Sequence, residues 1–166
     1  MPEVPYDELR WEVVLGAAGQ LGEQPAGHGR VLSGVALDFP EAPDGLAPDL
    51  TVLARDAVRG ERGRFGAAGV EAVLELARPG LGRAARAYAH GGVPVYVVID
   101  PMAAVCTVHT APSPEGVYRE AERVPFGNDL FLPLGGRTVV LRTDEFPVAS
   151  ATPGTGPGVG RGIVDG

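Results

Sequence analysis

The chain has 166 residues and a formal net charge of −7, and 45% of its residues are hydrophobic. This length predicts one domain with a sizeable core, and no apolar run approaches the roughly 20 residues of a membrane span, so we expect no membrane partner. The negative charge argues against strong non-specific attraction to nucleic acid.

The first third of the chain predicts a helix followed by two strands. Residues 7–21 have helical spacing, with Asp7 as the N-cap. Residues 30–39 predict a strand in which Gly34 marks a bulge or a close approach, and residues 40–47 predict a loop. A strand at 50–54 follows Pro48-Asp49, and residues 56–69, which lack periodicity, predict a mobile loop over one end of the sheet.

The central segment predicts a strand, a helix and a second strand. Two apolar runs, 71–77 and 93–99, are typical of buried strands. Between them, Leu81, Ala84, Ala85, Tyr88 and Ala89 form a stripe at helical spacing that would face the sheet. Gly91-Gly92 then ends the helix. Such a unit predicts a right-handed crossover between parallel strands.

The last part of the chain predicts short strands and a tail. Residues 103–110 and 117–124 predict a meander, and 130–132 and 138–141 predict two further strands. We therefore expect one domain over residues 1–147 and a disordered, Gly/Pro-rich tail over 148–166. Edge strands near the C-terminus predict pairing between subunits and hence a homodimer.

The cellular location follows from two features. The N-terminal sequence is acidic and lacks the basic and apolar regions of a signal peptide. The single cysteine, Cys106, excludes an internal disulfide and a thiolate metal cluster. A cytoplasmic protein is expected.

Glu75 is the most unusual residue, because its carboxylate sits inside an apolar strand. A buried carboxylate requires a cation, hydrogen-bond donors or a cleft. If the strand that Asp49 begins pairs with that of Glu75, the two carboxylates converge at one end of the sheet and could hold a divalent cation. In the alternative interpretation, Asp49 caps a turn and Glu75 pairs with Arg83 or Arg86. Residues 55–86 are arginine-rich, which is also typical of a solvated loop.

The motifs of the second half carry a resemblance to a known family. Pro48-Asp49, the VLEL strand at 73–76, AYAHGGVPVYVVIDP at 87–101 and VPFG at 124–127 resemble the Uma-two family of putative restriction endonucleases, of the PD-(D/E)xK nuclease superfamily. The similarity covers roughly residues 30–147. It implies an α/β, restriction-endonuclease-like core with a mixed sheet flanked by helices. It also implies that Asp49 and Glu75 bind Mg²⁺ (or Mn²⁺) and that DNA phosphodiester bonds are hydrolysed.

The chain departs from the family pattern near the central helix. Family members carry a lysine four residues before the helix tyrosine, where this chain has Ala84, and the preceding connection is shorter here. The family's glutamate-bearing N-terminal strand is missing. Arg83 or Arg86 would then supply positive charge and contact phosphate. Two hypotheses follow: a magnesium-dependent endonuclease acting on DNA, or a catalytically inactive nuclease-fold protein that serves as a binding or assembly module.

Overall fold

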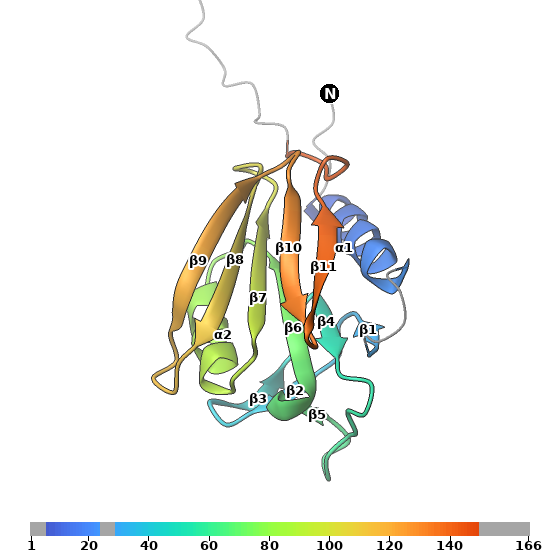
Figure 1. The fold of residues 1–166 in the computed structure, drawn as a ribbon. Helices are drawn as coiled ribbons and strands as arrows, with labels where there is room; N and C mark the ends of the chain where they lie inside the picture. The colour runs from blue at the N-terminus through green and yellow to red at the C-terminus, as the bar shows by residue number, and fades with distance from the viewer. Residues whose placement is uncertain (1–5, 24–28, 150–166) are drawn as a thin grey trace, which may run out of the picture.

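The computed structural model describes residues 6–23 and 29–149 and confirms an α/β architecture, a central mixed sheet flanked by helices (Figure 1). Its elements are α1 (Tyr6–Glu23), β1 (Val31–Leu32), β2 (Leu37–Phe39), β3 (Ala42–Leu46), β4 (Leu50–Leu53), β5 (Phe65–Gly66), the 3₁₀ helix η1 (Ala67–Gly69), β6 (Val70–Leu76), α2 (Leu81–His90), β7 (Val95–Asp100), β8 (Val105–Pro112), β9 (Tyr118–Pro125), β10 (Asp129–Leu134) and β11 (Arg137–Arg142). The part of the predicted tail beyond residue 149 lies outside the described residues.

The main sheet has six strands in the order β1-β4-β6-β7-β8-β9. The pair β6–β7 is parallel, and the other neighbours are antiparallel. This confirms the predicted parallel strand–helix–strand unit, since α2 connects β6 to β7. The predicted meander is also present as β8 and β9.

Two apolar layers sandwich this sheet. On one face, α1 and the antiparallel hairpin β10–β11 pack against β4, β6 and β7 through side chains such as Val13, Leu74 and Leu132 (Figure 1). On the other face, α2 and the small sheet β3-β2-β5 enclose a second core that includes Tyr88 and Tyr96. Within the described residues, no helix combines the length and apolar character needed to cross a membrane.

Three predictions for the first half of the chain were wrong. Residues 30–39 do not form one strand: Gly34, with φ +66°, separates β1 in the main sheet from β2 in the small sheet. The predicted loop at 40–47 contains β3, an edge strand that tolerates Pro43 because one of its sides needs no hydrogen-bond donors. The segment 56–69 is not wholly irregular, since it contains β5 and η1.

Candidate functional site

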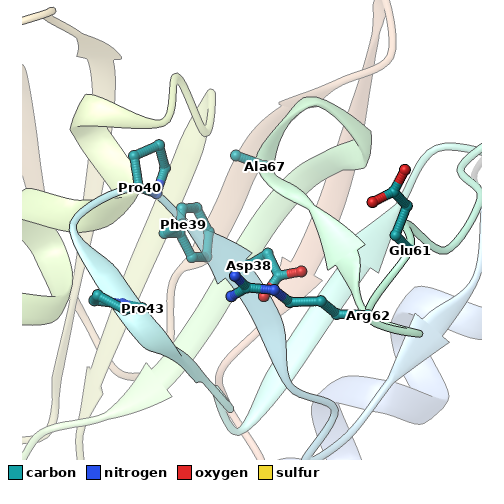
Figure 2. Close-up of a pocket in the computed structure, with 7 residues that line it drawn as sticks. All are labelled: Asp38, Phe39, Pro40, Pro43, Glu61, Arg62 and Ala67. Atoms are coloured by element: carbon teal, nitrogen blue, oxygen red, sulfur yellow. The ribbon is translucent and has the colours of Figure 1, made fainter.

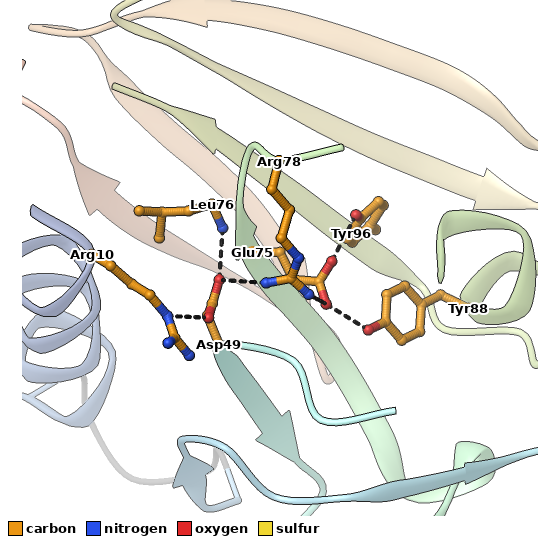
Figure 3. A network of polar contacts seen from close by, with 7 residues as sticks. All are labelled: Arg10, Asp49, Glu75, Leu76, Arg78, Tyr88 and Tyr96. Carbon is orange, nitrogen blue, oxygen red and sulfur yellow. Dashed lines mark hydrogen bonds and ion pairs between the residues drawn. The ribbon is translucent and has the colours of Figure 1, made fainter. Parts of the chain in front are cut away.

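The antiparallel register of β4 and β6 places Asp49 beside Glu75. Leu50 pairs with Leu74 across these strands, so one further step along the ladder brings the two acidic residues opposite each other. Each is only 1% exposed. The predicted convergence is therefore present, and Figure 3 shows both carboxylates grouped around the side chain of Arg78.

The Asp49 carboxylate is held by a helix and a strand. Arg10, from α1, donates from Nε to Oδ1 at 2.7 Å. The backbone N–H of Leu76 donates to Oδ2 at 2.9 Å. A charged donor and a backbone donor together fix the rotamer of Asp49.

The Glu75 carboxylate is held by two tyrosines that belong to the apolar core between the main sheet and α2. The Tyr88 hydroxyl of α2 donates to Oε1 at 2.7 Å, and the Tyr96 hydroxyl of β7 donates to Oε2 at 3.0 Å (Figure 3). Burial, followed by the neighbouring Glu75 charge, raises the pKa of each tyrosine well above its ordinary value. Both hydroxyls therefore stay protonated and remain donors to the carboxylate.

Arg78 bridges the two acids from the connection between β6 and α2. Its Nη1 lies 3.7 Å from Asp49 Oδ2, and its Nη2 lies 3.6 Å from Glu75 Oε1. The side chain of Arg78 is 42% exposed, so it covers the acids from the solvent side. With Arg10, it balances the charge of the two carboxylates, which reduces the cost of burying them.

The two arginines named from the sequence lie elsewhere on α2. Arg86 is exposed, and its Nε lies 3.4 Å from Oε2 of Glu41, which also contacts His90. Arg83 is exposed in the first turn and forms no ion pair among the described residues. The cation beside Glu75 is thus Arg78, not Arg83 or Arg86.

Four residues of the site were missed by reasoning from the sequence: Arg10, Arg78, Tyr88 and Tyr96 as polar partners of the acids. The tyrosines stand in the motif that carries the family resemblance, but their positions predicted only apolar packing. Arg78, three residues after Glu75, was the available signal for an ion pair.

The donor chemistry of the pair fits a hard divalent cation. Carboxylate oxygens are the ligands that Mg²⁺ prefers, usually with several waters. On β4, the strand that follows Asp49, the buried Thr51 hydroxyl has no hydrogen-bond partner among the described residues, and alternation puts it on the same face as Asp49. No cluster of three or more His, Cys, Asp or Glu side chains suited to a metal occurs within residues 6–23 and 29–149. Any bound cation would therefore depend on two carboxylates.

A pocket of about 540 Å³ lies in a different region, at the small sheet (Figure 2). Phe39 and Pro40 contribute apolar surface there, and Asp38, Glu61 and Arg62 contribute charged groups. Neither Asp49 nor Glu75 lines this pocket. The acidic pair is accordingly a separate site, covered by Arg78 instead of opening into this cavity.

Comparisons with known proteins point to one class. The model of a family named Uma2, described as "Putative restriction endonuclease", matches residues 10–142. Among solved structures, a crystal structure of "a putative nuclease belonging to DUF820 from Anabaena variabilis ATCC 29413" is similar, with a TM-score of 0.53 and 18% sequence identity. The alignment covers 81% of this chain and 74% of that chain. No curated protein matches the sequence.

Proposed function

This chain belongs to the Uma2 family of putative restriction endonucleases, and we propose that it is an endonuclease that hydrolyses phosphodiester bonds of DNA. The observation that supports this function best is the buried Asp49–Glu75 pair at one end of β4 and β6. Two carboxylates brought together in a nuclease fold provide ligands for the divalent cation that phosphodiester hydrolysis uses.

In this proposal, Asp49 and Glu75 hold Mg²⁺ or Mn²⁺. When bound, the cation would lower the pKa of a water and offset phosphate charge. The protein's own contribution is orientation: Arg10 and the Leu76 N–H fix Asp49, and the two tyrosines fix Glu75. In this proposal, Arg83, which is exposed on α2, would contact a phosphate group, whereas Arg86 would first have to leave Glu41.

A plasmid-nicking assay tests this function. Purified full-length protein is incubated with supercoiled DNA and Mg²⁺, Mn²⁺ or EDTA. We expect cation-dependent nicking that Asp49→Asn and Glu75→Gln abolish. Glu41→Gln is the matched control, since it removes an acidic charge from an ion pair outside the site and should leave nicking intact. Equal nicking by wild type and Asp49→Asn, or none with either cation, contradicts the proposal.

A second candidate is a catalytically inactive binding or assembly module. The specific observation in its favour is that Arg10 and Arg78 already balance the charge of both carboxylates. The chain also contains no lysine that could act as the family's catalytic lysine. This alternative predicts no thermal shift with Mg²⁺ or Mn²⁺, no nicking, and retained binding to DNA or to another protein.

The predicted homodimer would use an exposed sheet edge. β9 is the outer strand of the main sheet, and most of its side chains are exposed. Multi-angle light scattering on wild type and on Ala121→Pro, which removes a backbone donor in β9, tests this assembly. A monomeric mass for the wild type contradicts it.

A further inference from the structure

We propose that Arg78 is an exchangeable internal cation that closes the acidic site and must move out before a divalent cation binds between Asp49 and Glu75. This inference rests on the proposed function, because it assumes that the acids serve as metal ligands. It adds a control element that neither the family assignment nor the fold provides. The evidence is the way Arg78 contacts the acids, its place in the chain and the charge balance.

The contacts of Arg78 are looser than those of the other partners. Arg10 and the two tyrosines lie 2.7–3.0 Å from the carboxylate oxygens, which is hydrogen-bond distance. Arg78 approaches each acid only to 3.6–3.7 Å. Its hold on the carboxylates is therefore mainly electrostatic. Since the side chain of Arg78 is also 42% exposed, solvent partly screens these ion pairs.

The position of Arg78 in the chain lets its side chain move without disturbing the fold. Just beyond the end of β6, the N–H of Ala77 donates to the carbonyl of Ile99 at 2.8 Å. Arg78 comes one residue later, before a turn in which Gly80 has φ +88°. Rotation about its side-chain torsions would carry the guanidinium into solvent while β6, α2 and both acids keep their places.

The charge balance couples release of Arg78 to arrival of a cation. With Arg10 and Arg78 in place, two carboxylates face two guanidinium groups. If Arg78 left alone, one buried negative charge would remain uncompensated, which is unfavourable. A divalent cation would replace the lost charge at the same oxygens. Arg78 and the cation therefore compete, and the wild-type protein should bind Mg²⁺ and Mn²⁺ weakly.

The test is calorimetric titration of the full chain with MnCl₂, and the arms are wild type, Arg78→Ala and Arg119→Ala. Removing Arg78 should tighten Mn²⁺ binding about tenfold, the value of two solvent-screened ion pairs of roughly 0.7 kcal/mol each. Arg119→Ala makes the same change of net charge at an exposed arginine on β9, which β7 and β8 separate from β6, so it should match the wild type. Glu75→Gln in the Arg78→Ala background should remove the gain.

Three results would overturn this inference: an Arg78→Ala affinity no higher than that of Arg119→Ala, a gain that survives Glu75→Gln, or wild-type affinity equal to that of Arg78→Ala. If Arg78→Ala fails to fold, Arg78→Gln keeps a polar side chain and removes the charge, and the same comparison applies. The nuclease proposal fails separately. Tighter Mn²⁺ binding without nicking supports exchange and rejects catalysis, whereas nicking with equal affinities supports catalysis and rejects exchange.

Discussion

Replacing Tyr88 by Phe should destabilise the fold more than the loss of an ordinary hydroxyl. The Tyr88 hydroxyl donates at 2.7 Å to a carboxylate that is only 1% exposed, and water cannot take its place. Hydrogen bonds to charged groups contribute ~1.5–3 kcal/mol, so we expect a loss of about 2–3 kcal/mol. For a domain of this size, that corresponds to a fall of roughly 4–12 °C in the thermal midpoint. Urea unfolding followed by far-UV circular dichroism measures the free energy.

Tyr118→Phe provides the matched control for Tyr88→Phe. The Tyr118 hydroxyl donates at 2.8 Å to the carbonyl oxygen of Val93, a neutral acceptor in a half-buried position. That bond should contribute about 0.5–1.5 kcal/mol. In the Glu75→Gln background, Tyr88→Phe should have a smaller effect, because the acceptor is then neutral. If Tyr118→Phe costs as much as Tyr88→Phe, or if Glu75→Gln leaves the Tyr88 effect unchanged, charge at Glu75 does not determine the strength of this bond.

Three further predictions concern the rest of the fold. Burial raises the pKa of the Cys106 thiol to about 12. Native protein should therefore react with iodoacetamide at pH 8 about a thousandfold more slowly than urea-unfolded protein. Mass spectrometry measures both rates, and equal rates contradict this prediction. Burial lowers the pKa of His109 below its ordinary 6.5, so folding favours the neutral ring. The stability of the protein should therefore fall as pH drops from 6.5 through the folded-state pKa. If the thermal midpoint of His109→Gln depends on pH in the same way as that of the wild type, this prediction is wrong. Gly16→Ala should raise stability by about 1 kcal/mol, because a Cβ at this position of α1 would meet open space. Gly29→Ala should lower stability, because a Cβ there would lie 1.5 Å from the Leu53 carbonyl oxygen. Urea unfolding measures the sign of each change.

The strong patterns of the sequence predicted the centre of the fold. Long apolar runs and a helical stripe ended by Gly91-Gly92 indicated β6, α2 and β7, and these elements are present. The small sheet could not be predicted in the same way. Its strands have two to five residues, and β3 contains Pro43 and Gly45, which are more typical of a loop. Such strands depend on pairing with distant segments, and local periodicity carries no information about that pairing.

Strict alternation along β6 does not hold at Glu71. Alternation alone would put Glu71 on the same face of the strand as Glu75. The register between β4 and β6 shifts at Val52 and Leu53, so Glu71 has no partner across the ladder. Its Oε1 lies 3.1 Å from the point where a Cβ of Gly135 would stand, at the turn of the β10–β11 hairpin. A bulge of a single residue moved this carboxylate away from the acidic pair.

The acidic pair was predictable, but the source of its positive charge was not. A carboxylate in an apolar strand requires a partner, and pairing of adjacent strands brings Asp49 to it. That requirement is met equally by a metal ion, a helix arginine or a loop arginine. On α2, the buried side chains at Ala84 and Tyr88 define the face toward the sheet, and helical spacing puts Arg83 and Arg86 away from it. A connection of only four residues, 77–80, instead brings Arg78 over the acids. The length of this connection, which no periodicity encodes, thus determines that Arg78 lies over the two acids.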